Sequence, residues 1–505
     1  IGLGYKMLSQ YAGNEIFSKA INEYIKLNKL KNTGYVSFQD VLKLKTSNNL
    51  NWFYNDYLKI KSKGDYSIQK INSNKQTSSF KISKSKDYLN FPILLSFSKN
   101  NNVIDEKWLM FKKNDTIVSF ENQTKTFIEI NKNRFVSESN YNNNISSFEN
   151  FKKPLKFVLF NDFNDPKKNQ IYYTPLFNYN LYDGLMPGVK LSNATPIFKP
   201  FTYKISPYYS SKQKDILGKI NLKYVKYHDN NKLFSTQYFI GASTFHYKEN
   251  LAYTTLYPSI TFTFRENDLR SNYRQFINIR YISVYREENV NQEKYPNYNI
   301  FNAKYIFSNI SGEKGLTFNA DLQYSKNFFK NTFTFKFRNY YKDNRQYNLR
   351  LFLGKFISNS TKDDYYSFST YRARDYMYNY NLLGRSESTG FHSQQYIGSE
   401  GALKSKVKVE YANDLLLSLN AGITLWQWVE GYYDYAVIKN KNEKTQSAFD
   451  SGIRLNILTD YFELYFPFYS SLGNELNQSN YLDKIRFKIT FDVNTISALI
   501  SRRWF

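Results

Sequence analysis

The stretch Lys484–Val493, with the sequence KIRFKITFDV, alternates polar and apolar residues without interruption. Successive side chains of a β-strand point to opposite faces. One face would therefore be charged or polar, and the other would carry Ile485, Phe487, Ile489, Phe491 and Val493. A tilted strand of about ten residues matches the hydrocarbon thickness of a bilayer. The stretch thus predicts a membrane-spanning strand with lipid on one side and a wet lumen on the other.

The same alternation returns through the C-terminal two-thirds of the chain. Residues 316–325 and 332–338 show it most clearly. Further candidates centre near residues 189, 203, 222, 240, 262, 279, 305, 351, 409, 421, 455 and 465. Single-chain bacterial barrels have an even number of strands, so we predict a transmembrane antiparallel β-barrel of about 14 strands. The run 184–194 is the weakest candidate.

The alternation divides the side chains of the predicted barrel into two sets. The lipid-facing set is Leu316, Phe318, Leu322, Phe333, Phe335, Phe337, Ile485, Phe487, Ile489 and Phe491. The lumen-facing set is Asp321, Lys336, Arg338, Lys406, Lys408, Arg454, Lys484, Arg486 and Lys488.

Composition agrees with a barrel of this kind. Aromatic residues make up 19% of the 505 residues, which suits strands and the aromatic girdles at membrane interfaces. The sequence contains no run of about eighteen apolar residues, so it predicts no transmembrane helix. The chain has no cysteine, which excludes disulfides and thiolate metal sites.

The formal charge of +26 first suggests a nucleic-acid partner. The basic residues are scattered, however, and many alternate with apolar residues along predicted strands. A binding groove would cluster them, so we expect no nucleic-acid partner. The expected partners are outer-membrane lipid and other outer-membrane proteins in a complex.

The N-terminal part of the chain follows other periodicities. Residues 1–64 predict helices, with Phe17, Ala20, Ile21, Tyr24 and Ile25 at the spacing of one apolar face. Residues 65–150 contain short alternating runs and predict a small β-sandwich. We assign 151–183 to a linker or plug entry and 184–505 to the barrel, so the fold class is mainly β.

The connection 359–400 is too long for a plain turn, and connections of this length are usually functional or disordered. It combines aromatic and cationic side chains, of which we single out Tyr371, Arg372, Arg374 and Tyr376. Folded inward it would plug the pore, and folded outward it would be a partner surface. We favour a plug or lid.

The lengths of the connections suggest an orientation. Residues 287–297, 359–400, 428–446 and 470–483 form long connections, which belong on the outside in such barrels. With an even strand number, both termini would lie in the periplasm of a bacterium. An odd number would place the N-terminal part outside the cell.

Residues 1–64 also resemble the tail of the catalytic domain in zinc aminopeptidases of the gluzincin, alanyl-aminopeptidase type. The matching positions are Gly13, Phe17 and Tyr24, then Phe38 and Leu42, then Leu50, Trp52 and Phe53, with Tyr57 in place of a second Trp. Residues 65–145 are similar to the β-sandwich that follows in that family, including Trp108, Glu138 and Asn140. The resemblance implies a C-terminal part of such a protein, fused to an outer-membrane barrel of the kind expected in Bacteroidota.

Catalysis in that family needs a His-Glu-x-x-His helix that binds zinc and activates water. None of His228, His246 and His392 has this context, and we expect all three to be solvated. The family's zinc motif would precede Ile1. We therefore expect no catalytic residue, metal ligand or cofactor in this chain, any zinc belonging to an upstream domain. Whether the protein is an enzyme stays open.

Three functions fit these patterns. The first is an outer-membrane barrel that anchors a zinc aminopeptidase-like domain. The second is a scaffold subunit of an outer-membrane assembly or export complex, with an inactive peptidase-like domain. The third is a porin-like channel whose Lys- and Arg-lined lumen selects anionic solutes.

Overall fold

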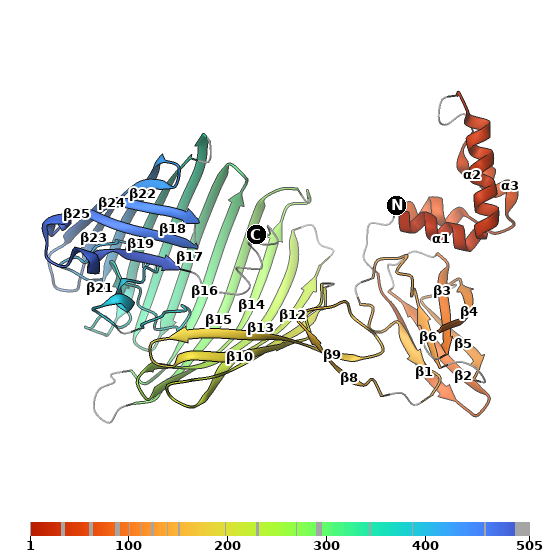
Figure 1. The fold of residues 1–505 in the computed structure, drawn as a ribbon, viewed down its shortest axis with the longest axis horizontal. Helices are drawn as coiled ribbons and strands as arrows, with labels where there is room; N and C mark the ends of the chain where they lie inside the picture. Colours follow the sequence, from red (N-terminus) through yellow and green to blue (C-terminus); the bar gives the residue numbers. More distant parts are fainter. Residues whose placement is uncertain are drawn as a thin grey trace. The chain divides into compact units, whose positions relative to one another are not determined.

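The computed structural model forms two compact units, an N-terminal unit of Ile1–Tyr172 with Asn193–Pro200, and a barrel unit of Tyr173–Ser192 with Phe201–Phe505 (Figure 1). The described residues are all except 1, 32–35, 60–63, 86–90, 100–101, 112, 123–125, 139, 150–151, 197, 229–231, 269, 289–294, 343–344, 386, 459–460 and 490–505.

The N-terminal unit begins with a helical block. Its elements are α1 (Gly2–Ala12), α2 (Asn14–Asn28), α3 (Phe38–Lys45), the π-helical turn η1 (Trp52–Asp56) and the 3₁₀ turn η2 (Tyr57–Lys59). Gly13 separates α1 from α2 at φ 94°, a conformation that other residues rarely adopt. Ser37 caps α3, since its hydroxyl oxygen accepts a hydrogen bond from the Asp40 backbone N–H at 3.2 Å.

Two antiparallel sheets follow in the same unit. One has the order β1 (Tyr66–Ser73), β2 (Thr77–Lys84), β5 (Asp115–Glu121). The other has the order β4 (Asn102–Leu109), β3 (Ile93–Lys99), β6 (Phe127–Ile130), β7 (Ile145–Ser147). Leu8 and Trp52 of the helical block belong to the same buried apolar cluster as Phe80 and Phe97 of the sheets. The helices and the sandwich therefore share one core.

Glu138 is a carboxylate inside this N-terminal unit, only 7% exposed. It accepts hydrogen bonds from the Tyr66 backbone N–H at 2.9 Å and from the side-chain amides of Asn131 and Asn144 at 2.5 and 2.8 Å. Burial outweighs these donors and raises the pKa of Glu138 from 4.5 to about 7.

The chain forms a closed antiparallel barrel, drawn in Figure 1 as long strands from yellow to blue. The first strands in the chain are β8 (Leu155–Leu159), β9 (Asn169–Asn180), β10 (Gly184–Ser192), β11 (Phe201–Tyr209), β12 (Ile216–Tyr227), β13 (Leu233–Lys248), β14 (Leu251–Arg265), β15 (Tyr273–Arg286), β16 (Asn297–Ile310), β17 (Lys314–Ser325), β18 (Phe328–Lys342) and β19 (Arg345–Asn359). The remaining strands are β22 (Leu415–Trp426), β23 (Val429–Lys439), β24 (Gln446–Leu458), β25 (Phe462–Ser470), β26 (Gly473–Asn474) and β27 (Arg486–Ile489). Of these strands, β8 and the first four residues of β9 fall within the bounds of the N-terminal unit given above.

The predicted fold class is confirmed, but the strand number is not. Within the described residues the barrel sheet has 18 strands, more than the predicted 14 or so. The segment 428–446, predicted as a long connection, contains β23, and the segment 151–183 contains β8 and β9. On β23 the buried inner face mixes Tyr432, Ala436 and Ile438 with Glu430 and Asp434, so large apolar side chains occur on both faces and the alternation is obscured.

Two predicted strands differ from the observed ones. Near residue 409 only β21 (Tyr411–Ala412) forms, and it pairs with β20 (Phe368–Ser369) away from the barrel sheet. Within the described residues of the run 484–493, β27 begins at Arg486, because Lys484 ends the 3₁₀ turn η5 (Tyr481–Lys484). Phe491 lies outside the described residues.

The antiparallel order defines two ends of the barrel. The connection between β19 and β22, residues 360–414, lies at one end, which we call the plug end. The connections 440–445 and 471–485 lie at the plug end too, whereas 311–313 and 427–428 lie at the opposite, far end. The chain enters β9 at the far end. No helix in the described part of the chain is long and apolar enough to cross a membrane.

Candidate functional site

Residues 360–414, which we call the plug, lie inside the barrel. They bind inward-facing side chains on several strands. The Tyr298 hydroxyl on β16 is 2.8 Å from that of Tyr365, and the Lys330 ammonium on β18 donates to the Tyr366 carbonyl at 2.6 Å. Tyr376 donates its hydroxyl proton to the Gln323 side chain on β17. The segment predicted as a plug or lid thus fills part of the lumen.

An aromatic cluster surrounds Lys330, whose side chain is only 1% exposed. Its ammonium lies 4.6 to 5.1 Å from the ring centres of Phe328, Phe356, Phe368 and Tyr376. Attraction between a cation and aromatic rings offsets part of the cost of burying this charge. Phe368 and Tyr376 belong to the plug, so this charge joins the plug to the barrel wall.

A second charged contact fastens the C-terminal half of the plug. The Lys404 ammonium donates to both carboxylate oxygens of Asp434 on β23, at 2.9 and 2.7 Å. The backbone N–H groups of Lys404 and Ser405 donate to Asp450 on β24 at 2.6 and 2.5 Å. Lys404, Asp434 and Asp450 are all buried. Losing one partner would leave buried charge uncompensated, so the contact holds the plug in place.

A network of opposite charges crosses the inner face of the C-terminal strands. Arg454 on β24 donates from Nε to Glu430 on β23 at 2.9 Å, and its Nη1 lies 3.7 Å from Glu463 on β25. Lys488 on β27 lies 3.8 Å from Glu463. Gln346 on β19 donates to Glu430 at 2.7 Å. Two of the predicted lumen-facing residues, Arg454 and Lys488, therefore take part in one buried network.

The middle of the plug contacts barrel segments from near the start and near the end of the chain's series of strands. Leu181, between β9 and β10, donates its N–H to the Leu383 carbonyl at 2.7 Å. On the other side, the Tyr396 N–H donates to the Phe487 carbonyl on β27 at 2.7 Å. Arg486 donates to the Ser393 carbonyl at 2.6 Å. One short part of the plug thus binds the first and the last strands.

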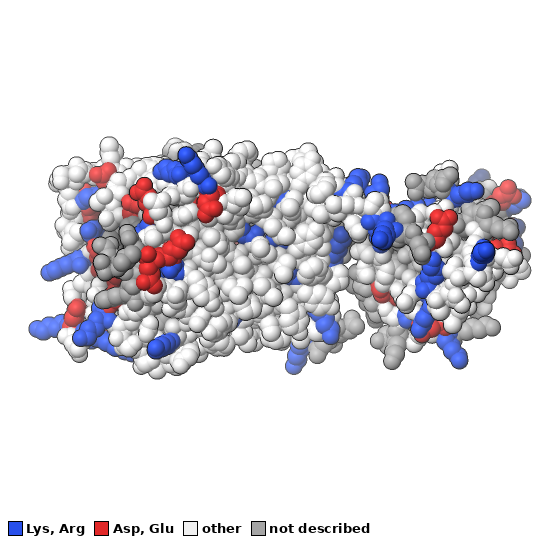
Figure 2. All heavy atoms as spheres, turned by 90° about the horizontal axis from the view of Figure 1, so that it is seen from below, with Lys and Arg blue, Asp and Glu red and all other residues white. Residues whose placement is uncertain are grey.

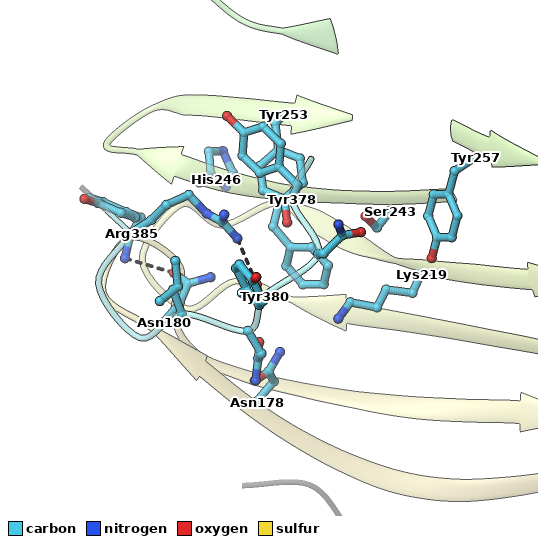
Figure 3. A pocket seen from close by; sticks show the side chains of 15 residues that line it. Asn178, Asn180, Lys219, Ser243, His246, Tyr253, Tyr257, Tyr378, Tyr380 and Arg385 are labelled. Atoms are coloured by element: carbon cyan, nitrogen blue, oxygen red, sulfur yellow. Dashed lines mark hydrogen bonds between the residues drawn. The ribbon is translucent and has the colours of Figure 1, made fainter. Parts of the chain in front are cut away.

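A cavity of about 150 Å³ lies where the plug meets β9, β13 and β14 (Figure 3). The Tyr378 ring stacks on Tyr253 with centres 3.8 Å apart, and the Arg385 guanidinium lies 4.6 Å from the Tyr378 ring centre. Beside them, His246 Nδ1 lies 2.6 Å from the buried carboxylate of Asp183. The prediction of a solvated His246 is wrong, since its side chain is 7% exposed.

The two faces of β17 and β18 differ as the alternation predicts. An inner cavity of about 890 Å³ is lined by Asp321, Lys336 and Arg338 of the predicted lumen-facing set. A hollow of about 420 Å³ on the outer face is lined by apolar side chains, namely Phe318, Phe333, Phe335, Leu351, Leu353, Leu417, Leu419, Tyr435 and Val437. Leu316 pairs with Phe337, and Leu322 lies two residues before the exposed Tyr324. Phe337, predicted to face lipid, also belongs to the lining of the inner cavity.

Several predicted positions lie elsewhere. Lys406 and Lys408 belong to the plug rather than to a strand and are exposed, with Lys406 3.3 Å from Glu410. Lys484 lies in η5, where it donates to Glu475 at 2.6 Å. The sequence from Lys404 to Val409 has the alternation expected of a strand, but these residues lie in the plug.

Around β27 the predicted faces are occupied by the plug. Phe487, predicted to face lipid, is 6% exposed because its ring stacks on Phe391 of the plug at 4.9 Å. Ile485 and Ile489 flank it at the ends of β27 and are half-buried. Arg486 faces inward, with its guanidinium 5.5 Å from the ring centre of Tyr371.

The other predicted plug residues bind within the plug. Arg374 forms an ion pair with Asp364 at 2.5 Å. The Arg372 backbone N–H donates to the Ser369 hydroxyl at 3.0 Å. These contacts give the plug its own internal structure.

In the described part of the chain no group of three His, Asp or Glu side chains is placed to hold a metal ion. His228 Nε2 lies 2.9 Å from the Thr236 hydroxyl, and His392 stacks on Tyr179 at 6.2 Å. The residues present do not fit a zinc site, so no catalytic step is assigned to zinc here. The Asp183–His246 pair was missed from the sequence because its members are far apart in the chain.

No family model matches the chain, and no curated protein matches it. Among solved structures, BamA from Haemophilus ducreyi lacking POTRA domains 1–3 is 12% identical, with a TM-score of 0.36 over 64% of this chain and 71% of that one. CdiB from Acinetobacter baumannii is 10% identical, with a TM-score of 0.27 over 57% of this chain and 53% of that one. The assignment of a barrel rests on the strand pairings described above.

Proposed function

We propose that this chain is an outer-membrane β-barrel that is sealed by its own plug and anchors the N-terminal unit to the membrane. The N-terminal unit is expected on the periplasmic side, because the chain enters β9 at the far end and the longest connections lie at the plug end. The proposal rests on the contacts by which the plug occupies part of the lumen.

The outer surface of the barrel supports a lipid environment. Large apolar side chains point outward and remain exposed on successive strands, among them Ile220, Ile240, Ile260, Ile279 and Leu351. In Figure 2 the middle of the barrel unit shows few charged side chains on the visible face, and charges gather toward its left end. Exposed apolar area on this scale is unfavourable in water and suits contact with lipid.

The plug supports an anchor rather than an open channel. Its aromatic cluster around Lys330 and its ion pair with Asp434 occupy the centre of the barrel. A solute crossing from one end to the other would have to displace these contacts. The porin-like alternative therefore has less support than the anchor.

The cargo proposed for this anchor is a peptidase-like domain. The residues that carry the resemblance to gluzincin aminopeptidases lie in the core of the N-terminal unit or pack against it, including Phe17, Tyr24, Leu42, Trp52 and Phe53. They are structural residues, so they support a shared scaffold and leave activity to an upstream domain. The same anchor would also serve as a subunit of an outer-membrane assembly or export complex.

Reconstitution into lipid bilayers tests the proposal. The intact chain should float with liposomes and give no steady conductance. A variant in which residues 362–411 are replaced by a short Gly-Ser linker should conduct ions. Steady conductance by the intact chain would instead support the porin-like function, and a monomer that stays folded in buffer without detergent would overturn the membrane assignment.

Activity of the cargo is tested on the complete gene product. Zinc-dependent release of N-terminal amino acids from peptides, retained in the outer-membrane fraction, is the expected result. A complete gene product that lacks this activity and co-purifies with other outer-membrane proteins would favour the scaffold role.

A further inference from the structure

The inner cavity of about 890 Å³, which we call the vestibule, is large enough for a small molecule. Its walls are the inner faces of β15 to β19, one side of the plug, and one or two positions on each of β22, β24, β25 and β27. Ile310 and Gly315, on either side of the turn 311–313, are part of its lining. The vestibule therefore reaches the far end of the barrel, while the plug lies above it.

Cationic side chains dominate the lining of the vestibule. They are Arg280, Lys304, Lys330, Lys336, Arg338, Arg350, Arg374, Lys404, Arg454 and Lys488. The acidic ones are Asp321, Asp375, Glu400 and Glu463. Three of these cations, Arg374, Lys404 and Arg454, form ion pairs with Asp364, Asp434 and Glu430 behind the lining. The cations outside these three pairs include Arg280, Lys304 and Arg350.

Two of the arginines are held in place by neutral groups. Arg280 donates to the side-chain oxygens of Asn302 at 2.6 Å and Asn379 at 3.2 Å. Arg350 donates to the Asn420 side-chain oxygen at 2.7 Å and to the Ser399 carbonyl at 3.3 Å. These contacts fix the guanidinium groups without cancelling their charge. Fixed guanidinium forks match the oxygen pairs of phosphate and carboxylate groups.

We propose that the vestibule binds a small, multiply charged oxyanion, carrying phosphate or carboxylate groups, that enters from the far end of the barrel. Cavities lined by one sign of charge and walled by protein concentrate ions of the opposite sign. The plug closes the path beyond, so the ligand binds and leaves by the same end. The vestibule is thus a binding site, a role that goes beyond membrane anchoring.

Calorimetric titration of the full chain in neutral detergent tests the site, with inorganic tripolyphosphate and citrate as probes. We expect saturable binding that weakens as salt rises. The double variant K304Q/K336Q removes two vestibule charges and should bind at least about tenfold more weakly. The control K406Q/K408Q removes two exposed plug charges and should bind like the parent chain. No binding to the parent chain at millimolar probe, or equal loss in both variants, would overturn the proposal.

A second measurement does not depend on removing lysines. The chain has no cysteine, so T334C places one thiol on the vestibule wall and S479C places one on the exposed connection 471–485. Each thiol is modified with an anionic (sulfonated) thiosulfonate reagent and with its cationic analogue. The ratio of the anionic to the cationic modification rate should be about tenfold higher at T334C than at S479C. Tripolyphosphate should protect T334C alone. Equal reagent preference at both thiols, or protection by an acidic peptide but not by tripolyphosphate, would overturn the small-oxyanion site.

Discussion

Neighbouring residues of one strand have opposite surroundings in this barrel. On β18, Thr334 lines the vestibule, whereas Phe335 pairs with Phe318 and Leu351 on the outer face. The sequence predicts this division because lipid and a wet lumen select different side chains at alternate positions. It does not predict the contact between His246 and Asp183, which are 63 residues apart in the chain and meet only in the folded barrel.

A charge placed on either side of β18 should have unequal effects. Phe335→Lys puts an ammonium on the lipid face near mid-strand, at a cost of roughly 2–4 kcal/mol. The fraction of this variant that folds into liposomes should fall sharply. That fraction is measured from the mobility shift of unboiled samples on SDS gels. Thr334→Lys places the same group in the vestibule and should fold as the parent chain does. Equal folding of the two variants would show that the faces are assigned wrongly.

Glu138 gives the N-terminal unit a specific pH dependence. Its pKa is raised in the folded state, so folding favours the protonated form. The stabilisation is complete below about pH 4.5 and is lost as pH rises toward 7, amounting to about 3 kcal/mol. Glu138→Gln should remove this loss. Urea unfolding of the full chain between pH 5 and 8 measures it, read from Trp52 and Trp108 after the barrel-unit tryptophans are changed to Phe.

The control for this experiment is Glu121→Gln on β5, an exposed carboxylate in the same unit. It should leave the pH dependence unchanged. A parent chain whose N-terminal unit gains stability between pH 5 and 8 would contradict the raised pKa.

At the scale of elements, a strand is easiest to predict from the sequence where its inner face lines the vestibule. β17 and β18 face the vestibule, and their polar inner residues keep the alternation visible. β23 faces the plug, and its inner face mixes Tyr432, Ala436 and Ile438 with Glu430 and Asp434, so the alternation is obscured. The plug itself was found by its length and composition, but its fastening points were not, because they depend on distant strands.

Two lysines of the plug offer a matched test of its fastening. Lys404 is buried against Asp434, whereas Lys406 is exposed. Lys404→Met leaves two buried aspartates without their cation, at a cost of about 3–5 kcal/mol. Trypsin should then cleave near Arg372 and Arg374, and brief channel openings should appear in planar bilayers. Lys406→Met should show neither effect, and identical behaviour of the two variants would rule out the Lys404 contact as the fastening.

At the scale of the whole molecule, each unit has its own core. The buried cluster of the N-terminal unit is separate from the clusters inside the barrel unit. We therefore expect two unfolding transitions in urea, with the N-terminal unit unfolding while the barrel persists in detergent. Leu42→Ala, at a fully buried position on α3, should lower the first midpoint alone, at a cost of about 2–5 kcal/mol.

Leu44, on the same helix, is 88% exposed and provides the control. Leu44→Ala should leave both midpoints in place. A single transition that shifts as a whole with Leu42→Ala would show that the units unfold together.

The residues that bind the plug differ in their position along the chain relative to the plug. Asp434, Asp450 and Arg486 all follow the plug along the polypeptide. Lys330 precedes the plug, whereas the carboxylates that bind Lys404 and its backbone come from β23 and β24. If strands insert in chain order, the plug lacks these contacts until β23 and β24 are in place, and we expect a chain truncated before β23 to be permeable to ions.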